Sequence, residues 1–139
     1  MLKIKNLYMQ YEENSVLENV SIDVPKNKLT TLLGKNGSGK STLLRLMAGT
    51  EIPSAGLVMY NDHSISRYDF SFVHDICFVH ESMDLLVPYS VNKYISIIND
   101  KIKNWDQDLF EEMANNRGID LNKNYQEFSR GQKMQVMLM

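Results

Sequence analysis

The chain opens with apolar and polar residues in alternation, a pattern typical of β-strands with one buried face. Apolar residues alternate with lysines over positions 2–5 and with polar residues over positions 20–24. We interpret the two segments as half-buried strands of an antiparallel layer, with Tyr11 in the turn between them. Positions 57–60 predict a further strand, which a turn at 61–62 closes.

Two other runs are apolar without a clean alternation. Positions 29–33 read Leu-Thr-Thr-Leu-Leu, and positions 76–79 read Ile-Cys-Phe-Val. Strands covered on both faces have this composition, so both runs predict buried strands. We therefore expect Cys77 to be a small buried apolar residue. As the single cysteine it cannot form an internal disulfide, which fits a reducing compartment.

Apolar residues recur at helical spacing in the segment that follows position 40. Helical spacing is also the main pattern from position 90 onward. The first helix is expected to end at Gly49, since glycine readily takes the left-handed conformation found at helix C-termini. Ser90, Asp106 and Ser129 stand where the N-caps of three later helices would lie. Gln132 completes the spacing of a capping box that begins at Ser129.

The single tryptophan has a structural explanation. Trp105 and Phe110 stand at the two positions of a hydrophobic staple around the cap Asp106. We therefore prefer a packing role for Trp105 to stacking on a ligand, and we expect Gly118 to end that helix.

The segment 34–41 reads Gly-Lys-Asn-Gly-Ser-Gly-Lys-Ser, which fits the phosphate-loop motif Gly-x-x-x-x-Gly-Lys-Ser/Thr between a predicted strand and a predicted helix. Its glycines let backbone N–H groups point toward a polyphosphate, and the helix adds the positive end of its dipole. Lys40 is expected to contact the β- and γ-phosphates as the catalytic lysine, and Ser41 to ligate Mg²⁺. The expected nucleotide contacts here are Gly34, Asn36, Gly37, Ser38, Gly39, Lys40, Ser41 and Thr42.

A phosphate loop defines the ligand class without defining the function. A GTPase would carry an Asn-Lys-x-Asp motif to read guanine. The two Asn-Lys pairs of the chain, at 92–93 and 122–123, are followed by Tyr-Ile and Asn-Tyr. Guanine specificity is therefore disfavoured.

Downstream of the phosphate loop, after a helical stretch, positions 128–132 read Phe-Ser-Arg-Gly-Gln. With this segment in place, the whole chain resembles the nucleotide-binding domain of ATP-binding cassette (ABC) transporters. The family signature is usually Leu-Ser-Gly-Gly-Gln, so Phe128 and Arg130 are departures. The resemblance implies an α/β fold: a P-loop NTPase core with an antiparallel β layer (1–80), an α-helical subdomain (81–128), and the signature with the start of its helix (129–139).

In that family two such domains pair head to tail, and the signature of one closes over the ATP of the other. The resemblance therefore implies that Ser129, Gly131 and Gln132 contact nucleotide held by a second nucleotide-binding domain, either an identical chain or a paralogue. The alternative is a plain helix cap. Tyr11 matches the aromatic residue that stacks on adenine, and the alternative there is a turn tyrosine without a ligand.

The resemblance also assigns Glu81 to the place of a family glutamine that follows a buried strand. A carboxylate there would contact Mg²⁺ or the attacking water, so Glu81 is a candidate metal ligand and catalytic residue. The apolar stretch 85–88 resembles the surface that receives a helix of the transmembrane permease, and the alternative is packing inside the helical subdomain. His63, His74 and His80 are expected to be ordinary histidines.

Charge and hydropathy limit the remaining partners. Lys and Arg number 15 against 17 Asp and Glu, and this balance gives no reason to expect nucleic acid. The N-terminus lacks the pattern of a signal peptide, and no stretch approaches the ~18 apolar residues of a membrane span. We expect a cytoplasmic chain held at the cytoplasmic face of the membrane by a permease subunit.

The last helix has no terminating residue before Met139, so the chain looks cut within it. The family's Walker B aspartate, catalytic glutamate and switch histidine would come later, and we expect poor hydrolysis by this chain alone. The first hypothesis is the ATP-binding part of an ABC transporter ATPase. The alternatives are a soluble cassette ATPase of translation or DNA repair, and a fragment that binds nucleotide without turnover.

Overall fold

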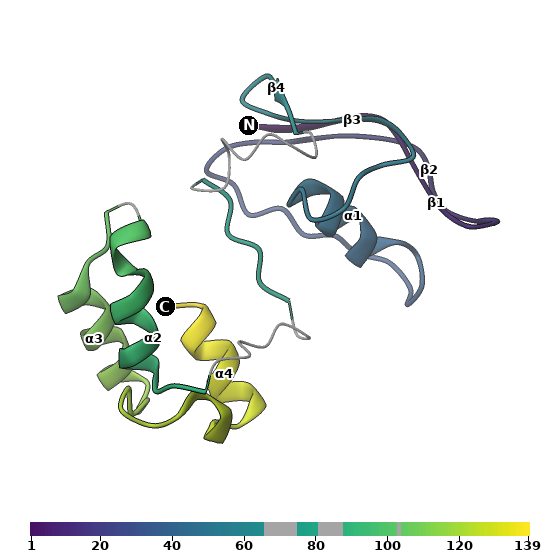
Figure 1. Cartoon of the computed structure of the whole chain (residues 1–139). Helices are drawn as coiled ribbons and strands as arrows, with labels where there is room; N and C mark the ends of the chain where they lie inside the picture. The colour runs from purple at the N-terminus through teal and green to yellow at the C-terminus, as the bar shows by residue number, and fades with distance from the viewer. Residues whose placement is uncertain (66–74, 81–87, 103) are drawn as a thin grey trace. The chain divides into compact units, whose positions relative to one another are not determined.

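The computed structural model describes residues 1–65, 75–80, 88–102 and 104–139 (Figure 1). The chain divides into two compact units, Met1–Phe78 and Val79–Met139. We describe each unit by itself. Within the described residues, no helix has both the length and the apolar character that crossing a bilayer would need.

The first unit is built on a four-stranded antiparallel sheet in the order β2-β1-β3-β4 (Figure 1). The strands are β1 (Leu2–Tyr11), β2 (Asn14–Val24), β3 (Ala55–Tyr60) and β4 (His63–Ser64). In the register, Ile4 lies between Ile22 of β2 and Val58 of β3. The antiparallel layer predicted from alternation is therefore confirmed, and Tyr11 is the last residue of β1.

A tight turn joins β3 to β4. Asn61 and Asp62 both have positive φ angles, 48° and 67°, as a two-residue hairpin turn of the favoured twist requires. The turn also meets the start of the chain, because the amino group of Met1 donates to Asn61 Oδ1 at 2.7 Å and Lys3 Nζ donates to Asp62 Oδ1 at 2.8 Å. The turn expected at 61–62 is confirmed.

The core of the first unit lies between the sheet and α1 (Lys40–Met47). Burial follows the inward-facing side chains of the strands and one face of the helix, and the buried residues are Ile4, Leu7, Met9, Leu17, Leu43, Leu46 and Val58. Gly49 follows the helix with φ 70°, the left-handed conformation expected from its position.

The two runs expected to form buried strands do not do so. Positions 29–33 and 76–79 have no strand structure, Leu29 and Leu33 are 97% and 87% exposed, and Cys77 is exposed. A strand covered on both faces needs neighbouring strands, and the described sheet contains only β1 to β4, none of which pairs with either run. These predictions, including a buried Cys77, were wrong.

The second unit is helical. It contains α2 (Val91–Ile98), the 3₁₀-helix η1 (Asn99–Lys101), α3 (Gln107–Asn116), the 3₁₀-helix η2 (Tyr125–Glu127) and α4 (Arg130–Met137). The predicted N-caps are confirmed, since the side chains of Ser90, Asp106 and Ser129 each accept a hydrogen bond from a backbone N–H of the following turn.

Aromatic and aliphatic side chains fill the core of this unit. The buried residues are Val91, Phe110, Ala114, Ile119, Tyr125, Phe128 and Val136. The Trp105 and Phe110 rings lie 5.0 Å apart, so the staple around Asp106 is confirmed. Gly118 follows α3 in the left-handed conformation with φ 63°, as expected.

Candidate nucleotide-binding site

The loop at 34–39 leads directly into the N-terminus of α1. The cap residue is Gly39, with φ 85° and no side-chain hydrogen bond to the first turn. The first helical bond joins Leu43 N–H to Gly39 O at 2.8 Å. Since the N–H groups of a first turn have no carbonyl partner inside the helix, the N–H groups of residues 39–42 are suited to an anion.

Close packing against β2 explains why residue 39 is glycine. A Cβ atom on Gly39 would lie 2.8 Å from Leu17 Cδ2 and 3.0 Å from Val16 O, in addition to the strain of the positive φ angle. Gly37 also has a positive φ angle, 81°, but a Cβ atom there would meet nothing within 4 Å. The loop is therefore held against the sheet at Gly39, and Gly37 serves its backbone conformation alone.

The Lys40 side chain is hydrogen-bonded to the backbone of the loop. Its Nζ atom donates to Gly34 O at 2.7 Å and to Lys35 O at 2.6 Å. A further bond, from Ser38 N–H to Lys35 O at 3.2 Å, closes the turn. Because an ammonium group has three donors, two bonds to the loop leave one N–H for a phosphate oxygen.

A pocket of about 370 Å³ lies in front of this loop. It is lined by Val16, Asn36, Gly37, Gly39, Lys40, Ser41 and Thr42. All of these except Val16 were predicted as nucleotide contacts. Gly34 and Ser38, predicted as contacts, are not among the lining residues. The groups offered are backbone amides, one ammonium and two hydroxyls, a donor set that suits a polyphosphate.

The metal site expected beside the phosphates is only partly described. Ser41 is exposed and lines the pocket, so its hydroxyl is accessible to Mg²⁺. The described ranges contain no cluster of three acidic, histidine or cysteine side chains that would hold a metal by themselves. Glu81 lies outside the described residues, so its metal and catalytic roles stay predictions.

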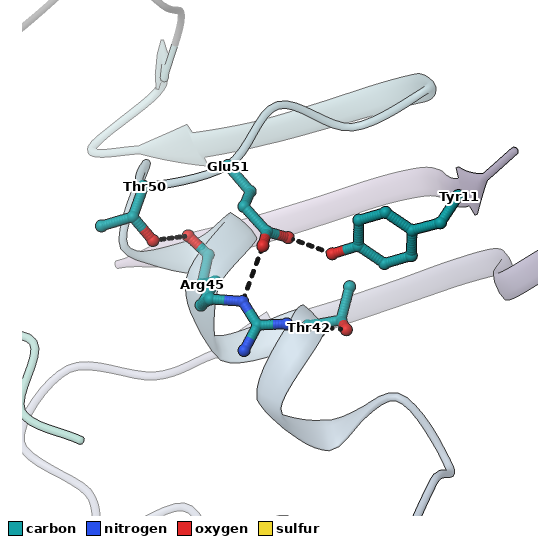
Figure 2. Close-up of polar contacts among 5 residues, drawn as sticks. All are labelled: Tyr11, Thr42, Arg45, Thr50 and Glu51. Atoms are coloured by element: carbon teal, nitrogen blue, oxygen red, sulfur yellow. Dashed lines mark hydrogen bonds and ion pairs between the residues drawn. The ribbon is translucent and has the colours of Figure 1, made fainter. Parts of the chain in front are cut away.

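Tyr11 belongs to a polar network that the sequence reasoning missed (Figure 2). Its hydroxyl donates to Glu51 Oε2 at 2.6 Å, and Arg45 Nε donates to Glu51 Oε1 at 2.7 Å. The Tyr11 hydroxyl and then the Glu51 carboxylate raise the pKa of Arg45 above its ordinary value, so the guanidinium stays charged. An arginine in the last turn of a helix with a glutamate just beyond it was the available signal.

The signature segment forms the N-terminus of α4. Ser129 Oγ accepts from Gln132 N–H at 3.3 Å, and Ser129 N–H donates to Gln132 Oε1 at 3.1 Å, which confirms the predicted capping box. Ser129 and Gly131 are exposed. The contact of Ser129, Gly131 and Gln132 with a nucleotide stays a prediction.

Phe128, the first departure from the usual signature, is a core residue. It is 6% exposed, and its ring lies 6.5 Å from the ring of Tyr125 in an edge-on arrangement. Lys123 Nζ lies 5.4 Å from the centre of the Phe128 ring. Phe128 therefore packs in the core of the helical unit, as an apolar residue at this position can.

Other predicted positions are placed only in part. His63 and His80 are exposed, whereas His74 and positions 85–87 of the expected permease contact lie outside the described residues. The permease contact therefore stays a prediction.

Comparisons with known proteins agree with the geometry. Residues 17–139 match the family model described as "ABC transporter". "Fe(3+) ions import ATP-binding protein FbpC" of Photorhabdus laumondii is 34% identical over 94 residues, which are 68% of this chain and 26% of that protein. "Spermidine/putrescine import ATP-binding protein PotA" of Acetivibrio thermocellus is 28% identical over an alignment of 144 positions, covering 99% of this chain and 40% of that protein.

Solved structures show the same fold. A "putative ABC transporter (ATP-binding protein)" from Pyrococcus furiosus superposes with a TM-score of 0.78 at 26% identity, covering 99% of this chain and 67% of that one. The protein described as "ATP binding subunit of ABC transporter" gives a TM-score of 0.83 at 22% identity, over 99% of this chain and 60% of that one. The α/β cassette fold expected from the sequence is confirmed, and the chain spans about a quarter of the length of FbpC, 26%.

Proposed function

We propose a function that follows from the family of this chain. The chain belongs to the ABC transporter family, as a nucleotide-binding domain. The chain binds ATP with Mg²⁺ at the loop 34–41 and supplies the ATP-binding part of a transporter ATPase. The observation that carries this proposal is the N-terminus of α1, which has no side-chain cap and faces a 370 Å³ pocket lined by Lys40 and Ser41.

The residues of the loop divide the work of holding the triphosphate. The amides of residues 39–42 and the dipole of α1 bind phosphate oxygens, and Lys40 adds a full positive charge while bracing the loop through Gly34 O and Lys35 O. The Ser41 hydroxyl would hold Mg²⁺, which when bound neutralises charge on the β- and γ-phosphates. Tyr11, 40% exposed at the end of β1, offers a ring face for the adenine.

Hydrolysis is an activity of the family, and the part of it that we propose for residues 1–139 is the binding of the nucleotide. Within these residues, Glu81 is the candidate for a group that contacts Mg²⁺ or the attacking water.

The proposed partners are a transmembrane permease and a second nucleotide-binding domain. Relatives named for iron and polyamine import support a place in an importer at the cytoplasmic face of a membrane. In the pair, Ser129, Gly131 and Gln132 would approach the nucleotide of the opposite domain.

The test is binding of ATP and of GTP in the presence of Mg²⁺, with phosphate release followed in the same samples. Lys40→Ala removes the loop's charge and its brace, and we expect ATP binding to fall at least about tenfold. Lys35→Ala is the matched control, because Lys35 offers its carbonyl to the brace and its side chain is exposed.

Binding of ATP that is lost in Lys40→Ala and kept in Lys35→Ala would support the proposal. Binding that is equal in the two lysine variants would contradict a phosphate site at this loop. Sustained release that needs Lys40 and is lost in Glu81→Gln would show that Glu81 supplies catalysis.

A further inference from the structure

Three segments of the first unit meet at the carboxylate of Glu51 (Figure 2). Tyr11 ends β1, Arg45 lies on α1, and Glu51 follows the turn after that helix. Both carboxylate oxygens are used, one accepting from the Tyr11 hydroxyl at 2.6 Å and the other from Arg45 Nε at 2.7 Å. The carboxylate therefore connects the expected adenine-stacking ring to the helix that begins at the phosphate loop.

The turn that carries Glu51 is itself fixed to α1. The Arg45 carbonyl accepts two bonds from Thr50, one from its backbone N–H at 3.0 Å and one from its hydroxyl at 3.1 Å. These bonds return the chain to the side of the helix where the Arg45 side chain lies. Glu51 is thus placed by backbone geometry as well as by its charge.

The network also reaches the pocket through Thr42. Arg45 Nη2 donates to Thr42 Oγ1 at 3.2 Å, and Thr42 is 6% exposed and lines the pocket. Because the hydroxyl oxygen accepts from Arg45, its own proton is directed elsewhere and is available to a ligand oxygen. The same guanidinium therefore orients a group at the phosphate end and holds Glu51 at the Tyr11 end.

We propose that Glu51 and Arg45 are positioning residues for the nucleotide, with Glu51 fixing the Tyr11 ring for the base and Arg45 orienting the Thr42 hydroxyl toward phosphate. This inference rests on the proposed ATP site. A role in stability alone explains less, because the side chains of Arg45 and Glu51 are 37% and 25% exposed and ion pairs at such exposure stabilise little.

The two parts of the ligand separate positioning of the base from binding of phosphate. Magnesium tripolyphosphate carries the phosphates without a base, so it binds the loop and cannot use Tyr11. In Glu51→Ala the ring loses its hydrogen bond, and we expect ATP affinity to fall about threefold with tripolyphosphate affinity unchanged. Tyr11→Phe keeps the ring and loses the same bond, so it should weaken ATP binding by a similar factor.

A double variant tests whether Glu51 acts through Tyr11. If it does, Tyr11→Phe together with Glu51→Ala weakens ATP binding no more than Glu51→Ala alone. Arg45→Lys removes the fork that joins Thr42 to Glu51, and we expect it to weaken both ATP and tripolyphosphate, by about threefold or more. Glu18→Ala, at an exposed position of β2, is the matched control and should change neither affinity.

The results distinguish this inference from the function beneath it. Equal losses for ATP and tripolyphosphate in Glu51→Ala, or no loss for either, would overturn the positioning role while Lys40-dependent ATP binding keeps the proposed function. If the unaltered chain does not bind ATP, or binds it as well as Lys40→Ala does, both the positioning role and the proposed function would be overturned. Circular dichroism of each variant shows whether it is folded. If Glu51→Ala does not fold, Tyr11→Phe provides the comparison of ATP affinity with tripolyphosphate affinity in its place.

Discussion

The α-helices of the two units differ in whether a side chain caps their N-termini. In the helical unit, α2, α3 and α4 are all capped by a side chain, from Ser90, Asp106 and Ser129, at N–H to oxygen distances of 3.3, 2.9 and 3.3 Å. In the first unit, α1 begins at Gly39 without a side-chain cap, in front of a pocket. Among the described helices, α2, α3 and α4 therefore have a side-chain acceptor at their N-termini, and α1 has none.

This difference separates stability from binding. A capping side chain typically contributes about 1 kcal/mol to the stability of its helix, so the caps of the helical unit are part of its folding free energy. Under the proposed function, the corresponding N–H groups of α1 gain their partners from a phosphate, so the corresponding free energy appears as affinity. Changes at Gly39 should therefore act on nucleotide binding as well as on the fold of the first unit, and changes at Ser129 on the fold of the helical unit.

The largest expected effect is at Gly39. In Gly39→Ala the new Cβ would meet Leu17 and the Val16 carbonyl at 3.0 Å or less, at a φ angle of 85°. The strain and the close contacts together should cost about 3 kcal/mol in the free energy of unfolding of the first unit and should abolish ATP binding. Hydrogen exchange of β1 and β2 measures the stability, and equilibrium binding of Mg-ATP measures the affinity.

Gly37→Ala is the matched control, since its Cβ would meet nothing within 4 Å at a φ angle of 81°. Only the backbone strain applies, and the cost should be about 1–2 kcal/mol. Equal costs for the two variants would show that contact with β2 does not explain the glycine at position 39.

The next largest effect is expected from bound nucleotide, which should stabilise the first unit and leave the stability of the helical unit unchanged. Mg-ATP at about 100 times its Kd stabilises the form that binds it by about 2.7 kcal/mol. We expect slower hydrogen exchange in β1 and α1 and no shift in the unfolding transition reported by Trp105, the single tryptophan, which lies in the helical unit. An equal shift in both units, or one that persists in Lys40→Ala, would contradict a site confined to α1.

Removal of the Ser129 cap should have a smaller effect. Ser129→Ala breaks the capping box at α4, and we expect the helical unit to lose about 1 kcal/mol of stability. Urea unfolding monitored by Trp105 fluorescence measures this loss. Ser96→Ala, inside α2, is the control and should stay within about 0.5 kcal/mol of the unaltered chain. An unchanged urea midpoint in Ser129→Ala would show that the box contributes nothing to folding.

Features set by nearby residues were predictable from the sequence. The alternation around Ile4 and Ile22, the caps at Ser90 and Asp106 and the staple at Trp105 depend on residues a few positions apart or on a simple two-strand pairing. The positive φ angles of Gly37 and Gly39 in the loop 34–41 follow for the same reason, since that backbone conformation needs glycine at fixed positions.

Features that depend on distant partners were not predictable in the same way. The composition of 29–33 indicates that the run suits a buried strand, but burial needs a neighbour, and none of β1 to β4 pairs with it. The contact of Tyr11 with Glu51 joins residues 40 positions apart, so no local pattern reveals it.

The smallest effect concerns a charge pair in the first unit. Lys3 Nζ lies 2.8 Å from Asp62 Oδ1, and the hydrogen bond from Lys3, followed by its charge, lowers the pKa of the Asp62 carboxyl below its ordinary value. The pair therefore stabilises the folded chain at pH values above the ordinary aspartate pKa, and this contribution is lost as the pH falls through the lowered value. The two side chains are 28% and 77% exposed, so solvent and salt screen the attraction and keep the effect small.

Asp62→Asn should consequently make the acid-unfolding curve of the first unit slightly less steep on its low-pH side, at low ionic strength, with no difference in high salt. Hydrogen exchange of β1 and β3 as a function of pH measures it, and Glu18→Gln, an exposed acid on β2, is the control. Identical curves for Asp62→Asn and the unaltered chain at low salt would mean that the pair contributes only geometry. The hairpin turn at 61–62 would then depend on its backbone conformation, just as the N-terminus of α1 depends on Gly39 and not on a capping side chain.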